Sequence, residues 1–238
     1  MYVRYICAFS SPISGPYGDL SAYFLSGFVV NTIRKKGAVI LSPQHMREIL
    51  IGRTISVIAA EGLDKTTTKA ITTGTGINEA YIYRHFADKE DLLSRAFEQL
   101  DEELVAITMQ HVSVMYMQAL DYELRCRVYF DAVWRFLLGN KEKCLAFVRY
   151  YYSPYFAKYS VAEHKRRYQP LVEKFGDAFK DEADVWMILN HILNVMLDFA
   201  VKVHNDQMPN NDDYAEHVFR VIYASVKQYF RELKEGDS

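Results

Sequence analysis

A short run from Asn78 to Phe86, with the sequence NEAYIYRHF, carries the side chains in this chain that are best suited to binding chemistry. At helical spacing Ile82 and Phe86 fall on one side of the run, and polar or aromatic side chains fall on the other. Such an outward set can reach base edges and phosphates when a helix enters the major groove of a DNA duplex. The run therefore predicts a recognition helix.

The outward side chains differ in what each can contact on DNA. Ala80 is small and lets the backbone approach, Tyr81 can pack on a thymine methyl or bind a phosphate, and Arg84 can bind phosphate or guanine. Tyr83 and His85 match backbone phosphates better than bases. We expect the run to contact both bases and phosphates.

Further candidate contacts flank these positions. Thr66, Thr67 and Lys69 precede the run and offer hydroxyl, N–H and ammonium groups to a phosphate, and Lys89 could bind the flanking strand. Glu79 is unexpected beside a polyanion. It either accepts a hydrogen bond from a cytosine amine or complements the dipole of its helix, and we favour the dipole.

Short helices around a glycine-containing turn are needed to position the run. Ser42 and the proline after it suit the start of a helix that Gly62 ends. Thr66 or Thr67 caps a short second helix, and Gly76 is the better candidate for left-handed backbone in the turn that follows. This is the layout of a helix-turn-helix DNA-binding domain, here residues 42–90, which we call the reader.

Asn78 caps the run itself, and Asp88 caps a longer fourth helix in which Asp91 forms an acidic analogue of the capping box. We find no strand-type alternation of useful length and no internal repeat. The predicted class is all-α, with an N-terminal three-helix domain at 42–90 joined to a larger helical body at 91–238. The expected helical spans beyond the reader are 88–118, 121–138, 141–153, 160–180, 183–205 and 212–234.

The composition is that of a globular protein with nearly balanced charge. The chain has 238 residues, half of them apolar, and a formal net charge of −2, which argues against coating nucleic acid by charge alone. From 42 to 90 basic and acidic residues are equal in number, so binding must depend on placement. One such module binds DNA weakly, and we expect a dimer that reads two half-sites.

Enzymatic and metal chemistry find little support. The three cysteines lack CxxC or CxxH spacing, which favours buried or idle thiols in a reducing cytoplasm. GTGINE, from Gly74, resembles a nucleotide fingerprint but has Glu79 at its third glycine and no preceding strand, and the histidines are scattered singly. We predict a cytoplasmic protein that is not an enzyme, with no catalytic residues, no metal and no cofactor.

Residues 1–41 are hard to assign to a packed element. Serine, glycine and proline at 10–18 oppose a helix, and the apolar stretch from Ala22 to Ile33 is shorter than the roughly 20 residues that cross a bilayer. We expect a poorly ordered arm, or a translated leader upstream of a true start near Met46. A membrane-surface helix is a third option, and we expect no membrane partner.

Residues 47–97 resemble the DNA-binding region of the TetR (tetracycline-repressor-like) family of bacterial transcription regulators. The matching stretches are REILIGRTISVIAAEGLDKTTTKAI and TGINEAYIYRHFADKEDLL, in which YRHFADKEDLL is especially specific. Thr72 and Thr75 stand where alanines are usual, and Asn78 stands where serine is common. The resemblance covers about a fifth of the chain well.

The resemblance implies a dimeric repressor whose effector-binding and dimerisation domain, here 91–238, binds a small molecule and releases a double-stranded DNA operator. It places seven residues on positions that the family uses near DNA: Thr67, Asn78, Ala80, Tyr81, Tyr83, His85 and Lys89. The alternative is a DNA-binding protein of the same fold without a small-molecule effector, architectural or regulated by a protein partner. Activation instead of repression also stays open.

Aromatic residues crowd the middle of the body, where core packing is the default role for each. A pocket for a small apolar or aromatic effector would have the same composition, with a few polar tips. Asn190, Asn194 and Asp198 form a polar line that could face solvent, a dimer partner or the ligand, and the run from His164 to Arg167 suits a solvated face or an anionic effector. The expected pocket lining is Trp134, Phe147, Tyr151, Tyr168, Trp186 and Asn190.

The family implies that the last two long helices pair with their twins across a two-fold axis. The last helix has an apolar stripe at three- and four-residue steps, and the helix before it is apolar around most of its circumference. We predict a homodimer interface formed by Val218, Ile222, Val226 and Tyr229.

Overall fold

The computed structural model describes residues 33–35, 38–40 and 42–231 of the chain, whose contacts divide between Ser42 and Pro43 into two units. In the first unit, β1 (Ile33–Lys35) and β2 (Ala38–Ile40) form an antiparallel pair in which Ile33 faces Ile40. The sequence reading had predicted no strand, so this short hairpin is a correction. The other predictions for residues 1–41 lie outside the described residues.

The second unit begins with the reader. Helix α1 spans Pro43–Glu61, and Gly62 ends it with φ +84°. Helix α2 (Thr68–Thr72) is capped by Thr67, whose hydroxyl accepts from the Ala70 amide at 3.1 Å. Gly74 and Gly76 both have positive φ in the turn, one more than predicted. The recognition element then consists of a 3₁₀ turn, η1 (Glu79–Tyr81), and α3 (Ile82–His85).

The body that follows is helical throughout, with most boundaries close to those expected. The predicted 160–180 span is shorter, and Ser153 with Pro154 starts a separate short helix because serine caps it and proline occupies its first turn. The all-α class is confirmed for the second unit. The elements are α4 (Lys89–His111), η2 (Val112–Tyr116), α5 (Tyr122–Gly139), α6 (Lys141–Tyr151), α7 (Pro154–Tyr159), α8 (Val161–Gly176), α9 (Val185–His204), α10 (Asp212–Val226) and η3 (Lys227–Tyr229).

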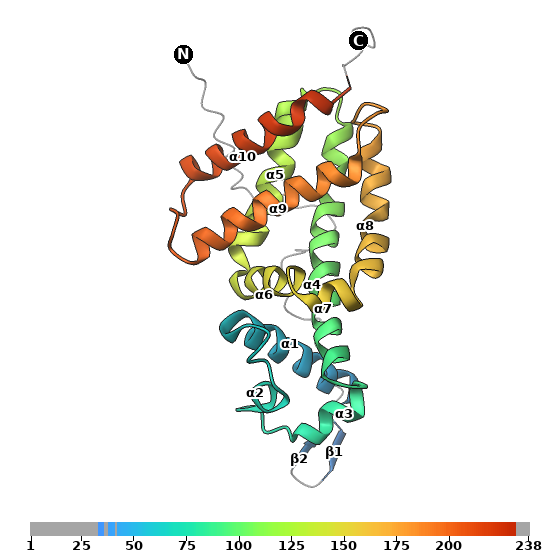
Figure 1. Cartoon of the computed structure of the whole chain (residues 1–238), viewed down its shortest axis with the longest axis vertical. Coiled ribbons are helices and arrows are strands. Elements are labelled where there is room, and N and C mark those ends of the chain that lie inside the picture. The colour runs from blue at the N-terminus through green and yellow to red at the C-terminus, as the bar shows by residue number, and fades with distance from the viewer. Residues whose placement is uncertain (1–32, 36–37, 41, 232–238) are drawn as a thin grey trace, which may run out of the picture. The chain divides into compact units, whose positions relative to one another are not determined.

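Three apolar clusters of described residues stabilise reader and body, and one of the two in the body joins η2, α8 and α9. In the reader, Ile82 and Phe86 are buried against Leu50, Ile71 and Leu92, which confirms the predicted inward side of the recognition run. In the body, side chains of α4, α5, α6, α9 and α10 form a large apolar cluster that also includes the end of α1. Helix α4 runs without a break from the reader into the body (Figure 1), so the expected boundary at residue 90 falls in a continuous helix.

The start of α4 depends on a cap made by two carboxylates. Asp88 accepts from the Asp91 amide at 2.7 Å, and Asp91 accepts in return from the Ala87 amide at 3.0 Å. We expect Asp88→Ala to lower the free energy of unfolding by about 1 kcal/mol, because an orphan amide of the first turn loses its acceptor. Urea denaturation of Asp88→Ala beside Asp64→Ala, an exposed aspartate outside any helix, measures this. Equal stability of the two variants would contradict the assigned cap.

Candidate nucleic-acid interface

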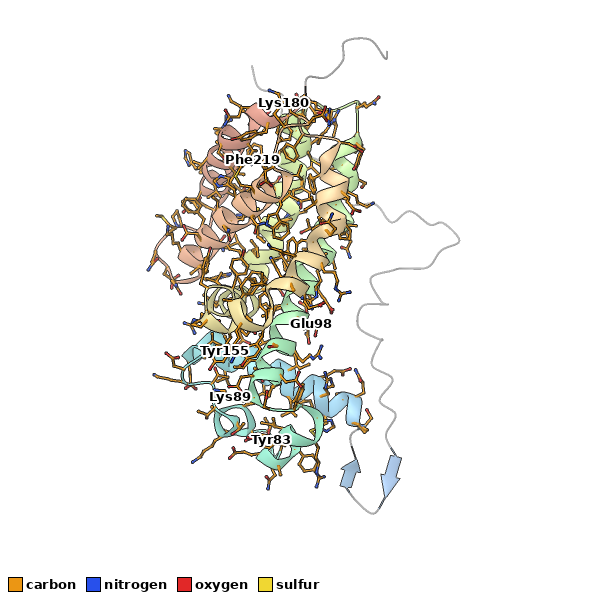
Figure 2. All side chains as sticks on the ribbon, turned by 45° about the vertical axis from the view of Figure 1, so that its right-hand side comes forward. Tyr83, Lys89, Glu98, Tyr155, Lys180 and Phe219 are labelled. Atoms are coloured by element: carbon orange, nitrogen blue, oxygen red, sulfur yellow. The ribbon has the colours of Figure 1, made fainter. Side chains whose placement is uncertain are left out.

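The recognition element presents its predicted outer side to solvent. Tyr83 is 60% exposed and Tyr81 is 39% exposed, while Ile82 between them is fully buried. Ala80 and Arg84 are also exposed. Figure 2 places Tyr83 on the reader, at the far end of the second unit from Lys180. The element is therefore a surface rod anchored on one side, as a groove-reading helix must be.

Local contacts orient the outer side chains. The Asn78 side chain caps η1 by accepting from the Ala80 amide at 2.9 Å, which fixes the entry of the chain into the recognition element. The Arg84 guanidinium lies 4.6 Å from the centre of the Tyr81 ring, a cation–π distance. The two predicted base contacts thus lie side by side and form one cationic, aromatic tip.

Glu79 has a contact that neither sequence alternative included. Its carboxylate accepts a hydrogen bond from the Thr68 hydroxyl, across the turn from α2. The bond joins the start of α2 to the start of η1, and Glu79 still lies in the first turn, where negative charge complements the helix dipole. Glu79 therefore has a bracing contact within the reader itself.

The flanking candidates divide between exposed and buried positions. Thr67 and Lys69 are exposed beside the recognition element, and Lys89 is half-buried with its ammonium 6.0 Å from the Tyr155 ring. His85 is half-buried. Thr66 departs from the prediction, because its side chain is fully buried and its hydroxyl donates to the Gly62 carbonyl at 2.7 Å. Thr66 stabilises the turn after α1 and does not offer its hydroxyl to a phosphate.

Two arginines of α1 have a role that the sequence reading missed. Arg47 donates to the His85 carbonyl at 2.7 Å and lies over the Phe86 ring at 4.6 Å. Arg53 donates to the Thr73 carbonyl at 3.3 Å. Both bind carbonyls at the ends of short helices, where backbone acceptors lack helical partners. They hold α2 and α3 onto α1. In the sequence, the spacing of these basic residues along one long helix is the only feature that points to this role.

A third arginine joins the reader to the body. Arg149 of α6 donates to the carbonyls of Ile58 and Ala59, each at 2.7 Å, near the end of α1. Ser56 donates to the Glu142 carboxylate at 2.8 Å in the same junction. The reader is therefore attached to the body through the packing of α1 on α6 as well as through the continuous helix α4.

Most of the predicted pocket residues come together in the body, but they pack against one another. Phe147 stacks on Tyr151 at 5.7 Å, the Tyr151 hydroxyl donates to Asn190 at 3.3 Å, and Tyr168 and Trp186 meet edge to face at 6.1 Å. Trp134 is the exception. It stacks on Phe130 at 5.6 Å, and Phe130 in turn meets Phe219 of α10 at 5.5 Å, so none of the ring contacts described for Trp134 is to that group.

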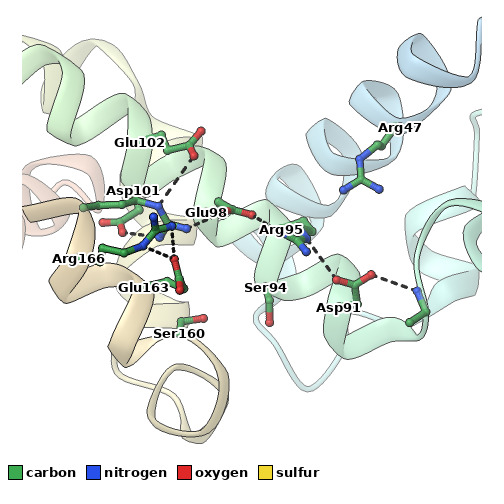
Figure 3. Close-up of polar contacts among 12 residues, drawn as sticks. Arg47, Asp91, Ser94, Arg95, Glu98, Asp101, Glu102, Ser160, Glu163 and Arg166 are labelled. Carbon is green, nitrogen blue, oxygen red and sulfur yellow. Dashed lines mark hydrogen bonds and ion pairs between the residues drawn. The ribbon is translucent and has the colours of Figure 1, made fainter.

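The run from His164 to Arg167 is not uniformly solvated, which corrects the sequence interpretation. His164 donates through Nδ1 to the buried Asp101 carboxylate at 2.9 Å. Arg167 donates to Asp101 at 3.0 Å and to Glu98 at 2.6 Å, so α8 is tied to α4 by charge. Figure 3 shows polar contacts continuing along α4 from Glu98 through Arg95 to Asp91. Asp101 falls on the inner side of α4, and no sequence pattern indicated its role.

Cavities in the described part of the body are of two kinds. An open polar cleft of about 350 Å³ lies between the start of α4 and the α7–α8 junction, and the carboxylates of Asp91, Glu98 and Glu163 on its walls are already paired with arginines. Three small cavities have mostly apolar walls. Those of about 40 and 30 Å³ lie among α5, α8 and α9, the larger also reaching α10, and one of about 20 Å³ lies among α4, α5 and α6. Tyr129 and Met196 line both of the first two.

The predicted dimer residues point inward. Val218 is 2% exposed, and Ile222 and Val226 are likewise buried in the protomer core, so the apolar stripe of α10 packs on its own body and the prediction for these three is wrong. Tyr229 is half-buried in η3. The outward side of α10 carries Val221, which is 57% exposed.

Helix α9 is unusually apolar for its limited burial. By length and composition it could cross a membrane, with only 22% of its most apolar window buried. It packs along α5, α6, α8 and α10 (Figure 1), as a core helix does. Met187 and His191 are exposed on it, as is Asp198 of the predicted polar line. A second helical surface could cover this side.

The two described cysteines agree with the expected idle thiols. Burial raises the pKa of the Cys126 thiol and of the Cys144 thiol to about 12. Both thiols therefore stay protonated at neutral pH, and a protonated thiol is a poor nucleophile. Cys7 lies outside the described residues.

Comparison with known proteins bears on the reader and on the fold. Residues 50–96 match the family described as bacterial regulatory proteins, tetR family. No curated protein matches the sequence. Similar solved structures include a TetR family transcription regulator from Marinobacter aquaeolei VT8, at 15% identity over 76% of this chain and 95% of that chain, with a TM-score of 0.63.

Two further structures show the same fold. The fatty acid degradation regulator FadR from Bacillus halodurans is 18% identical over 83% of this chain and all of that chain, with a TM-score of 0.58. A TetR-like transcriptional regulator from Rhodococcus sp. RHA1 is 14% identical over 82% and 99%, with a TM-score of 0.55. Residues 50–96 therefore match the helix-turn-helix region of the tetR family, and the chain shares the fold of these TetR-family regulators.

Proposed function

We propose that this protein is a cytoplasmic, homodimeric repressor that binds an operator through the recognition elements of two copies and is released by a small molecule. The observation that carries the DNA-binding part is the exposed tip of Tyr81, Tyr83 and Arg84 on an element whose other side is buried. Exposed aromatic side chains lower the solubility of a protein, and a group of them on the surface indicates that a partner covers it. Duplex DNA is the partner whose shape and charge fit.

The DNA contacts divide by position on this surface. Arg84 and Tyr81 would enter the major groove, with Ala80 allowing close approach of the backbone. Asn78, Tyr83, His85, Thr67, Lys69 and Lys89 would bind phosphates on either side. Arg47 and Arg53 would act only by positioning, since their guanidinium groups already bind reader carbonyls.

The dimer would form through the outward sides of α9 and α10. The apolar character of α9 and its low burial favour a helical partner over water. Val221 and Met187, both more than half exposed, would lie in this interface. A two-fold axis here would bring the same residues of both copies together and set the spacing of the two readers.

The effector part of the proposal concerns the interior of the body. A small apolar or aromatic molecule would bind among the aromatic residues between α4, α8 and α9, and would move α4, which carries the reader. The similarity to a regulator of fatty acid degradation is compatible with an apolar effector. A ligand that binds more tightly when α4 is in a position that does not fit DNA would lower the affinity for the operator.

A second candidate is a DNA-binding regulator of the same fold without a small-molecule effector. The small size of the three apolar cavities favours it, because a drug-sized ligand needs a few hundred cubic ångströms. The cleft beside α4 is large enough, but its acidic walls are mostly paired. We favour the ligand-responsive function because the interior contains a buried nitrogen, Nε2 of His164, that lacks a hydrogen-bond partner among the described residues.

The experiment that tests the proposed function is a duplex selection. Purified full-length protein is incubated with a random duplex library at near-physiological salt, and bound DNA is amplified over several rounds. We expect a palindromic or near-palindromic site, since two identical readers related by a two-fold axis recognise symmetric DNA. Recovery of no preferred sequence, or of an asymmetric single site bound by one chain, would contradict it.

A further inference from the structure

A buried histidine in the body has one satisfied ring nitrogen and one unsatisfied one. His164 is 2% exposed, and its Nδ1 donates to the Asp101 carboxylate at 2.9 Å. Its Nε2 has no hydrogen-bond partner among the described residues. A buried polar atom without a partner destabilises the fold, so proteins rarely keep one unless another group binds it. This nitrogen marks a place where a hydrogen-bonding group is expected.

Aromatic rings surround the imidazole that carries this nitrogen. Ring centres lie between 4.4 and 6.2 Å from the centre of the His164 ring, from α4, α6, α7, α8 and α9. Those of Trp186 and Tyr151 are half-buried and reach the surface. Flat apolar faces of this kind favour an aromatic guest over a flexible polar one. The rings are Phe97, Tyr151, Phe156, Tyr168 and Trp186.

The hydrogen bond between His164 and Asp101 determines which hydrogen-bonding group a ligand needs in order to bind Nε2. Asp101 accepts from Arg167 as well as from His164, so an acceptor faces Nδ1 and the proton of the imidazole lies on that nitrogen. The Nε2 atom is then an acceptor on a neutral ring, or a donor if the ring is protonated. A hydroxyl group satisfies either state, because it both donates and accepts.

A second unpartnered group lies beside the first. The Tyr168 hydroxyl is buried close to the Asp101 carboxylate, and among the described residues it makes no hydrogen bond of normal length and angle. Burial, and then the charge of Asp101, raises the pKa of Tyr168 well above its usual value, so this hydroxyl stays protonated. Tyr168 also lines the interior cavity of about 30 Å³, with Leu189 and Met196 among its neighbours. Apolar space therefore continues from the polar pair into the body.

We infer that the effector site of this regulator is centred on His164 and takes an aromatic alcohol of the phenol type, whose hydroxyl binds Nε2 and whose ring lies among the surrounding aromatic side chains. The inference rests on the proposed function and names the ligand class of its site. Apolar substituents of the ligand extend toward the cavity beside Tyr168. The half-buried Trp186, in the first turn of α9, moves to admit the ring.

The same contact connects the ligand to the reader. His164 lies on α8 and Asp101 lies on α4, the helix that begins directly after the recognition element. A ligand that binds Nε2 and displaces the imidazole changes its bond to Asp101, and with it the bridge from Arg167 to Glu98. Helix α4 then shifts relative to α8. His164 is therefore both the anchor of the ligand and the first residue of the path to DNA.

The test compares two probes that differ only in the hydroxyl. Isothermal titration of the full-length protein with 4-ethylphenol and with ethylbenzene should show about tenfold tighter binding of the phenol, because ethylbenzene leaves Nε2 without a partner. In His164→Phe the preference should disappear, while His191→Phe, an exposed histidine on α9, should keep it. Equal binding of the two probes by the wild type, or a preserved preference in His164→Phe, would overturn the site.

Further outcomes separate the site from the proposed function. If His164→Phe fails to fold, the comparison of the two probes on the wild type still tests the site. Tyr168→Phe then serves as the second variant. A hydroxyl preference without any specific DNA binding would contradict the regulator and leave the site intact. Specific DNA binding that 4-ethylphenol does not weaken, although the phenol binds, would overturn the path through Asp101. Specific DNA binding with no binding of the phenol would overturn the ligand class and leave the regulator intact.

Discussion

Tyr83→Ala should lower the affinity for the selected operator by about 100-fold while the dimer stays intact. Tyr83 is 60% exposed and no described residue depends on it for packing, so its removal leaves the reader folded. Loss of about 1.4 kcal/mol at each of two recognition elements gives about 100-fold in affinity. Fluorescence anisotropy with the labelled operator measures the loss, and sedimentation velocity measures the dimer.

The matched control is Tyr116→Ala. Tyr116 is also exposed but lies in η2, beyond the far end of α4, where it donates to the Lys174 carbonyl. The Tyr116→Ala variant should bind the operator as tightly as the wild type does. If Tyr83→Ala bound as tightly as Tyr116→Ala, the outer side of the recognition element would not be the DNA contact.

Val221→Asp should convert the protein to monomers that bind the operator at least about 100-fold more weakly. Near a two-fold axis each copy would bury a carboxylate against its twin, and like charges without partners are costly to bury. A monomer reads one half-site, and single readers bind DNA weakly. Sedimentation velocity at micromolar protein and anisotropy on the operator measure the two effects.

Two valines provide the controls for this variant. Val128→Asp alters an exposed valine on α5 and should leave a dimer, whereas Val218→Asp buries a charge in the protomer core and should lower the melting temperature of the fold itself. A surviving dimer in Val221→Asp would exclude the α9–α10 surface. Loss of helical circular dichroism in Val221→Asp, at the level of Val218→Asp, would place Val221 in the core.

The reader could be derived from sequence because its signals are local. Caps at Thr67, Asn78 and Asp88 fix where helices begin, and each is a side chain that accepts from an amide two or three residues along the chain. The burial of Ile82 and Phe86 follows from helical spacing alone. Such features require no knowledge of distant contacts.

The body was harder because its decisive contacts join residues far apart in the chain. The stripe containing Val218 was correctly identified as apolar, but spacing cannot distinguish the protomer core from a dimer partner. Asp101 and His164 pair across 63 positions, so neither residue alone indicates a buried network. Thr66 differs from these residues, because its hydroxyl bonds back to Gly62 only four residues earlier; a threonine near a helix start can make either this local bond or a phosphate contact, and residue type alone does not distinguish them.

The most direct measurement is methylation interference on the selected operator, which reports guanine N7 atoms in the major groove. We expect two patches of interference with centres about 10 base pairs, or a multiple of one helical turn, apart, and loss of both patches with Tyr83→Ala. Interference confined to the minor groove, or patches unchanged by Tyr83→Ala, would contradict a recognition element that reads the major groove from Asn78 to Phe86.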